Sequence, residues 1–148
     1  MRKDAAQMEL KVRDVMTGIP VMLRPEQTVT DAACAMRDFA VGCVLVAGRR
    51  QLHGLITDRD IVVRAIADAR DPATLPLSDV CSRDIAVVAP TDDLDDAVKI
   101  MRRKAVRRLP VVEDDRAVGI VSLGDLALET ERDTASTLAD ITAAPPNA

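Results

Sequence analysis

The sequence repeats itself after a shift of 65 residues, and this duplication constrains the fold more than any other feature. Between positions 14 and 60, twelve residues are identical to the residue 65 positions later, without a gap. The identical pairs include Pro25 with Pro90, Gly54 with Gly119, and Asp60 with Asp125. Such a duplication predicts two copies of one supersecondary unit. The chain of 148 residues is long enough to bury a core that needs no metal or disulfide.

Each half of the repeat carries the same pattern of apolar residues. Apolar positions at helical spacing predict amphipathic helices over residues 29–40 and 94–105. Two short apolar runs separated by a polar turn follow each helix and predict a hairpin. An extended segment precedes the first helix of each half, and a second helix is expected near Thr57 and Ser122. The predicted architecture is therefore an α/β chain of the α+β class, made of two tandem β-α-β-β-α repeats.

The repeat also predicts the domain organisation. The first repeat is expected over residues 10–67, a linker over 68–76, and the second repeat over 77–130. A unit of this size buries little surface alone, so the two halves are expected to pack with pseudo-two-fold symmetry. The tail over 131–148 belongs to neither repeat and is predicted to be a frayed helix with an extended end.

The composition excludes several chemistries. The chain has one histidine, His53, so several histidines of one chain cannot form a metal site. Phe39 is the only aromatic residue and the net charge is −4, which argue against nucleic-acid binding. No apolar run is long enough to span a membrane. The three cysteines are an odd number without metal-ligand spacing, so we expect buried free thiols in the cytoplasm: Cys34, Cys43 and Cys81.

One motif occurs at the same place in both repeats: a strand, a hydroxyl residue, two further residues, a carboxylate and a helix. The hydroxyl and the carboxylate are Thr57 and Asp60 in the first repeat, and Ser122 and Asp125 in the second. A capping box at the start of the helix explains this spacing. A ligand site explains it too, because a carboxylate can accept two hydrogen bonds from a ribose diol while the hydroxyl and the helix amides face a phosphate. The residues alone leave both interpretations open.

Several motifs, in order and at fixed spacing, closely resemble the cystathionine-β-synthase (CBS) domain family. The resemblance covers residues 10 to 130 in two copies and indicates a stand-alone CBS pair, or Bateman module. The motifs that carry it are Val12-Arg13-Asp14-Val15-Met16-Thr17, Val41-Gly42-Cys43-Val44-Leu45-Val46, Gly54-Leu55-Ile56-Thr57-Asp58-Arg59-Asp60-Ile61, Val106-Arg107-Arg108-Leu109-Pro110-Val111-Val112 and Val118-Gly119-Ile120-Val121-Ser122-Leu123-Gly124-Asp125-Leu126.

The resemblance implies a function as well as a fold. It implies clefts between the repeats that bind adenosine-containing ligands such as AMP, ADP, ATP or S-adenosylmethionine, with no cofactor. Asp60 and Asp125 match the ribose-binding acid of the family, and Thr57 and Ser122 match its phosphate-facing hydroxyl. Residues in the segments that usually flank the adenine are Ile19 and Ile85.

Three features of the second repeat bear on the resemblance to the CBS family. Pro110 has no proline counterpart in the first repeat, which leaves the shape of the first cleft open, and Cys81 stands where the family usually has methionine. A basic run ends in Arg107 and Arg108. Its first part complements the end of a helix, whereas Arg107 and Arg108 lead into a strand, where one of them could pair with a ligand phosphate.

The sequence therefore predicts a regulatory module that senses an adenosine ligand and signals to a partner protein. The alternative is a structural or protein-interaction module without a nucleotide ligand. An enzyme is not expected, because Asp60 and Asp125 come with no positioned base, nucleophile or metal set. We also expect a homodimer, since the helices around Met36 and Met101 carry more apolar surface than one small sheet covers.

Overall fold

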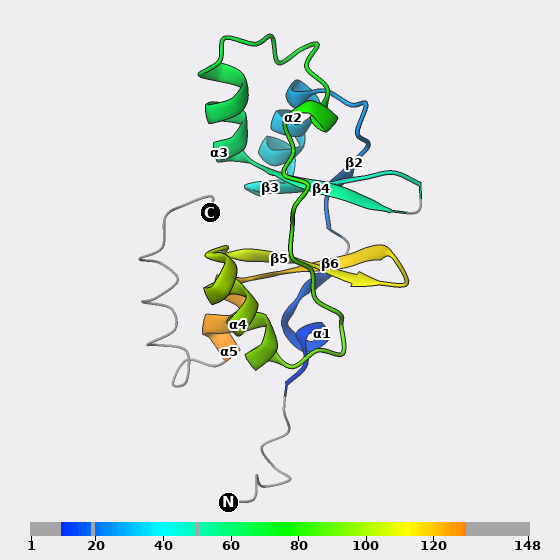
Figure 1. Cartoon of the computed structure of the whole chain (residues 1–148), viewed down its shortest axis with the longest axis vertical. Coiled ribbons are helices and arrows are strands. Elements are labelled where there is room, and N and C mark those ends of the chain that lie inside the picture. Colours follow the sequence, from blue (N-terminus) through cyan, green and yellow to red (C-terminus); the bar gives the residue numbers. More distant parts are fainter. Residues whose placement is uncertain (1–9, 19, 50, 130–148) are drawn as a thin grey trace, which may run out of the picture. The chain divides into compact units, whose positions relative to one another are not determined.

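The computed structural model describes residues 10–18, 20–49 and 51–129 (Figure 1). Ile19 and the tail predicted over 131–148 lie outside the described residues. The helices and strands are α1 (Val12–Val15), β1 (Thr17–Gly18), β2 (Met22–Leu23), α2 (Val29–Phe39), β3 (Cys43–Ala47), β4 (Leu52–Thr57), α3 (Asp58–Asp60), the π-helical η1 (Ile61–Ile66), the 3-10 helix η2 (Leu77–Asp79), α4 (Leu94–Lys104), β5 (Arg108–Glu113), β6 (Arg116–Ser122) and α5 (Leu123–Glu129).

This order confirms the predicted α+β fold with two repeats. Helices α2 and α4 end one residue earlier than predicted, at Phe39 and Lys104, because the next residues, Ala40 and Ala105, adopt the left-handed conformation with φ of 54° and 55°. Thr28 begins α2 by accepting a hydrogen bond from the Asp31 amide. The short helices α1 and η2 were not predicted, because each is a single turn without a measurable apolar period.

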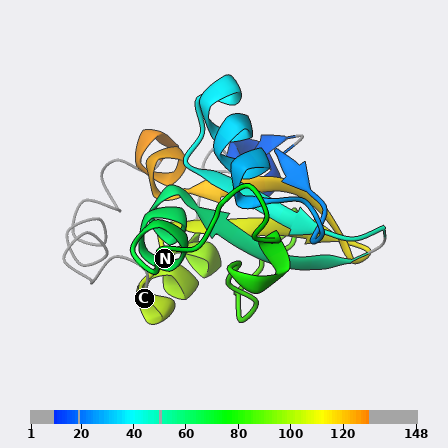
Figure 2. The ribbon, with the colours of Figure 1, turned by 90° about the horizontal axis from the view of Figure 1, so that it is seen from above.

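Two three-stranded sheets carry the helices. One sheet has the order β2-β3-β4, with β2 parallel to β3 and β3 antiparallel to β4. The other has the order β1-β6-β5, with β1 antiparallel to β6. Helices α2 and α3 lie on one face of the first sheet, and α4 and α5 lie on one face of the second (Figures 1 and 2). Val88 forms a parallel bridge with Val111, as Leu23 does with Val46 in the first sheet.

The chain divides into two compact units that differ from the two sequence repeats. Among the described residues, the α2 unit contains 20–49, 51–85 and 114–117, and the α4 unit contains 10–18, 86–113 and 118–129. The segment at the start of each predicted repeat therefore packs in the unit of the other repeat. Each unit is therefore completed by a segment that the sequence assigns to the other repeat, and we call these the exchanged segments: residues 77–85 in the α2 unit and 10–18 in the α4 unit.

Equivalent hydrogen bonds hold the two exchanged segments. In the α2 unit, the Leu77 amide donates to the Gln27 carbonyl oxygen at 2.7 Å. The matching bond in the α4 unit runs from the Val12 amide to the Asp92 carbonyl oxygen at 2.9 Å. At the sheet edges, Ser82 forms an antiparallel bridge with Leu55, and the equivalent pair in the α4 unit is Thr17 with Ile120.

Each unit has its own hydrophobic core. In the α2 unit, Leu77 of the exchanged segment is fully buried with Ile56 of β4. In the α4 unit, Val12 of the exchanged segment is fully buried with Met101 and Leu126. The exchanged segments thus supply apolar surface whose burial stabilises the unit they enter. None of the three cysteines is in a disulfide; Cys43 and Cys81 are buried as predicted, and Cys34 is only partly buried.

Candidate functional site

Thr57 and Asp60 form a complete capping box where β4 leads into α3. The Thr57 amide donates to Asp60 Oδ2 at 2.9 Å, and the Asp60 amide donates to Thr57 Oγ1 at 3.1 Å. The Asp58 amide donates to the Gly42 carbonyl oxygen at 3.0 Å, in register with the pairing of β3 and β4, at the point where the helix begins. Local chemistry therefore fixes the Asp60 carboxylate at the first turn of the helix.

Ser122 and Asp125 form the same arrangement where β6 leads into α5. The Ser122 amide donates to Asp125 Oδ2 at 2.8 Å, and the Asp125 amide donates to Ser122 Oγ at 3.1 Å. The Leu123 amide bonds the Arg107 carbonyl oxygen at 2.8 Å. The capping interpretation of the motif is confirmed in both repeats, and each carboxylate keeps a second oxygen, Oδ1, for another partner.

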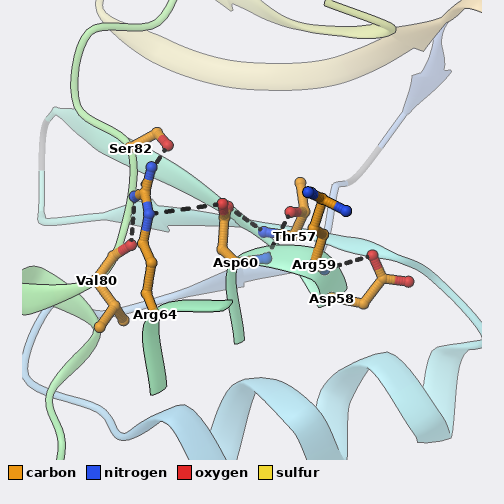
Figure 3. Close-up of polar contacts among 7 residues, drawn as sticks. All are labelled: Thr57, Asp58, Arg59, Asp60, Arg64, Val80 and Ser82. Carbon is orange, nitrogen blue, oxygen red and sulfur yellow. Dashed lines mark hydrogen bonds and ion pairs between the residues drawn. The ribbon is translucent and has the colours of Figure 1, made fainter. Parts of the chain in front are cut away.

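The surroundings of the two acids differ. Asp60 is 4% exposed and is the one buried charged residue in the described part of the chain. Its Oδ1 lies 3.9 Å from Nε of Arg64, one turn further along the helix (Figure 3). Asp125 is partly exposed, and within residues 10–129 as described its carboxylate accepts no hydrogen bond other than the one from Ser122. The two copies of the motif are alike in backbone and unlike in environment.

A glycine three residues before each hydroxyl lets a neighbouring segment approach the strand. A Cβ built on Gly54 would lie 2.5 Å from the Ser82 carbonyl oxygen, which no real Cβ tolerates. At Gly119 the equivalent atom, the Thr17 carbonyl oxygen, would lie 2.8 Å away. The sequence showed that both glycines are identical across the repeat, but it gave no signal for the segment that each one admits.

The other predicted site residues divide between the two units. Arg107 and Arg108 are exposed at the start of β5, and the backbone of Arg107 lies beside the start of α5. Pro110 is buried in β5, and its carbonyl oxygen accepts a hydrogen bond from the Val88 amide at 3.1 Å. Ile85 is partly buried at the end of the α2 unit. The structure thus brings the Arg107 backbone to the second motif.

The described residues also bear on metal binding and on membrane insertion. In the described residues, no group of three histidine, cysteine, aspartate or glutamate side chains could hold a metal ion. Among the same residues, no helix is both long enough and apolar enough to cross a bilayer.

Comparison with known proteins agrees with the fold and the repeat. The model of the CBS domain matches twice, over residues 12–66 and 77–131. The CBS domain-containing protein YhcV of Bacillus subtilis (strain 168) is 41% identical over 117 residues, covering 79% of this chain and 83% of YhcV.

Solved structures share the architecture. The conserved CBS domain protein TA0289 of Thermoplasma acidophilum, described as of unknown function, superposes with a TM-score of 0.81 at 27% identity, covering 92% of this chain and 76% of that one. The CBS domain pair of protein MJ0100, in complex with 5′-methylthioadenosine and S-adenosyl-L-methionine, superposes with a TM-score of 0.75 at 20% identity, covering 84% and 98%. At that identity the second similarity concerns the fold alone.

Proposed function

The chain belongs to the CBS domain family, and on that premise we propose that it is a regulatory module for an adenosine-containing ligand. The proposed ligands are AMP, ADP, ATP and S-adenosylmethionine, and ligand occupancy is signalled to a partner protein. The protein acts by binding, without turning the ligand over. Its free thiols suit the reducing cytoplasm, where we place it.

The observation that carries this proposal is the geometry of the second motif. Asp125 is held by the Ser122 amide through Oδ2, so its orientation is fixed before any ligand arrives. Its partly exposed side chain can accept hydrogen bonds from a ribose diol through Oδ1. Charge-assisted hydrogen bonds to a preoriented carboxylate are among the stronger polar contacts available to a ligand hydroxyl.

The fold and the nearby charges give further support. In MJ0100 the same fold holds two adenosine compounds. In the α4 unit of this chain, Arg107 and Arg108 are exposed, and the Arg107 carbonyl oxygen accepts a hydrogen bond from the Leu123 amide at the start of α5. We assign one of them to a ligand phosphate, because a guanidinium recognises phosphate oxygens bidentately. A place for Ile85 beside the adenine stays a prediction from the family resemblance, and Ile19 lies outside the described residues.

Thermal unfolding with a panel of nucleotides tests the proposal. A specific ligand at about 100 times its Kd should stabilise the protein by about 2.7 kcal/mol and raise Tm. Circular dichroism is the suitable signal, because the chain has no tryptophan or tyrosine. The ligands are AMP, ADP, ATP and S-adenosylmethionine at millimolar concentration, with guanosine nucleotides as the control, and all should be recovered intact. Unchanged Tm with every ligand would favour the structural or interaction module.

We keep the prediction of a homodimer, but we place its contact on a different surface from the one that the sequence suggested. Met36 and Met101 are buried in the cores of their own units, so they do not supply an exposed apolar face. In the α2 unit, however, helix α2 packs against η1, and three large apolar residues of these helices are exposed: Phe39 at 65%, Val62 at 57% and Ile66 at 57%. A soluble chain that exposes such a patch commonly covers it with a partner.

We therefore expect light scattering to give twice the chain mass of 15.9 kDa. Ile66→Glu should shift the protein toward monomer, because it places a charge in the contact. Val87→Glu is the matched control, since Val87 is an exposed apolar residue at 43% outside this patch. A monomer across a wide concentration range would contradict the dimer, and equal dissociation by both variants would contradict the assignment of the face.

A further inference from the structure

We infer that Arg64 is a positioning residue: paired with Asp60, its side chain holds residues Val80–Ser82 of the exchanged segment on the α2 unit. We call these contacts of Arg64 the latch, and Asp60 serves as their acidic partner. The second repeat has a glutamate, Glu129, at the position that corresponds to Arg64, and we assign the ligand to Asp125. The latch itself rests on contacts within the α2 unit. The assignment of the ligand to the second repeat rests in addition on the proposed function.

The Arg64 guanidinium bridges the first motif and the exchanged segment (Figure 3). Its Nη1 donates to the Val80 carbonyl oxygen at 2.9 Å and to Ser82 Oγ at 3.3 Å. Its Nε lies 3.9 Å from Asp60 Oδ1. One side chain of η1 thus contacts the acid of the motif and the segment that enters from the second repeat.

The burial of Asp60 explains why the guanidinium is held there. A carboxylate that is 96% buried needs an opposite charge and hydrogen-bond donors, because burying it alone is costly. The Thr57 amide satisfies Oδ2, and Arg64 supplies the charge next to Oδ1. Asp60 in turn restricts the direction of the Arg64 side chain, which is otherwise long and flexible. A diol that bound Asp60 would have to compete with this pair.

The segment that Arg64 contacts has few other polar ties to the sheet. Ser82 and Leu55 exchange two backbone hydrogen bonds, with the Leu55 amide donating at 3.0 Å and the Ser82 amide donating at 2.9 Å. This is an isolated bridge rather than a continuous strand pair. Isolated bridges open more readily than long ladders, so the contacts of Arg64 with Val80 and Ser82 are expected to limit this opening.

The second repeat differs at the position that corresponds to Arg64. The residue 65 positions after Arg64 is Glu129, a residue type without a guanidinium to donate to a carbonyl oxygen or to pair with a carboxylate. The counterpart of Ser82 is Thr17. Asp125 is partly exposed, whereas Asp60 is buried. Asp60 therefore has a structural partner in Arg64, whereas Asp125 is accessible to a ligand. We expect one adenosine ligand per chain for this reason.

Amide hydrogen exchange of Arg64→Met tests the latch without any ligand. Methionine keeps the length of the stem and helix propensity but removes every donor and the charge. We expect the Leu55 and Ser82 amides to exchange about tenfold faster, because lost hydrogen bonds from a charged donor shift local opening by at least that factor. Arg64→Lys, which keeps the charge but loses the fork, should fall between wild type and Arg64→Met.

Arg70→Met is the matched control. Arg70 follows η1 and its Nη2 lies 3.7 Å from Asp79 Oδ2, so it too links the end of the helical segment to the exchanged segment. Both side chains are about half exposed, and an exposed ion pair adds little stability, so exchange should change less than about twofold. Equal exchange at Leu55 and Ser82 in Arg64→Met and Arg70→Met would overturn the latch.

Titration calorimetry tests the unequal repeats, using whichever nucleotide of the panel raises Tm. One ligand per chain is expected in the wild type. Two ligands per chain of equal affinity would overturn the assignment of the ligand to the second repeat. If no nucleotide of the panel binds, the proposed function fails together with that assignment, while the exchange measurements still decide whether Arg64 latches the segment.

Discussion

Gly54→Ala should destabilise the protein by about 1–3 kcal/mol, the usual cost of forcing extra volume into a packed site. The new Cβ would lie 2.5 Å from the Ser82 carbonyl oxygen and 3.0 Å from Cys81 Sγ. The nearest obstacle is backbone, so a side-chain rotation cannot relieve it. Relief requires the exchanged segment to move away from β4, which breaks the bridge between Leu55 and Ser82.

Gly119→Ala should have the same sign and a smaller size. Its new Cβ would meet Met16 Sδ at 2.7 Å and the Thr17 carbonyl oxygen at 2.8 Å. The methionine thioether is flexible and can give way, but the carbonyl cannot. Both substitutions lie where an exchanged segment meets the edge of a sheet. The loss in the free energy of unfolding therefore measures how much each unit depends on its exchanged segment.

Urea unfolding followed by circular dichroism measures both changes. Gly18→Ala is the matched control, because Gly18 pairs with Gly119 across β1 and β6 but its new Cβ would meet no atom within 4 Å. Its unfolding midpoint should stay near that of the wild type. A Gly54→Ala protein as stable as Gly18→Ala would show that the segment around Ser82 does not pack against β4 at this distance.

Asp125→Asn should lower nucleotide affinity roughly ten- to a hundredfold while changing stability little. Asparagine keeps the size of the side chain and can accept the Ser122 hydrogen bond, so the start of α5 stays capped. It loses the charge that strengthens hydrogen bonds from a ribose diol, and such a loss costs about 1.5–3 kcal/mol. That range corresponds to the expected change in Kd.

Asp60→Asn should show the opposite pattern. Asp60 is buried and lies beside Arg64, so the substitution removes an ion pair and costs stability, by about 1 kcal/mol after discounting for the partly exposed arginine. Nucleotide affinity should change little, because the ligand is assigned to the second repeat.

Calorimetry and thermal unfolding of the two variants separate the roles. Unaltered affinity in both would mean that the acids only cap their helices, as their hydrogen bonds already show that they do. Equal losses of affinity in both would mean that the repeats bind alike and that Arg64 does not set them apart.

Local patterns in the sequence determined the elements of this protein. The 65-residue repeat predicted two similar halves, and apolar spacing placed α2 and α4 to within one residue at their ends. The hydroxyl and carboxylate spacing predicted the capping boxes at Thr57 and Ser122, because a capping box is made entirely of residues that are neighbours in the chain. The fold class and the starts of the longer helices were therefore readable without a structure, whereas the single-turn helices α1 and η2 were not.

Only the tertiary structure decided which segment completes which unit. No local pattern shows that residues near Ser82 pack on β4 or that Thr17 pairs with Ile120, because these contacts join residues far apart in the chain. The same is true of the difference between Asp60 and Asp125, which share a motif and a capping bond. Their environments diverge because Arg64 reaches Val80, a contact that depends on where the exchanged segment lies in space. Sequence set the local hydrogen bonds, and long-range packing set the burial and charge around them.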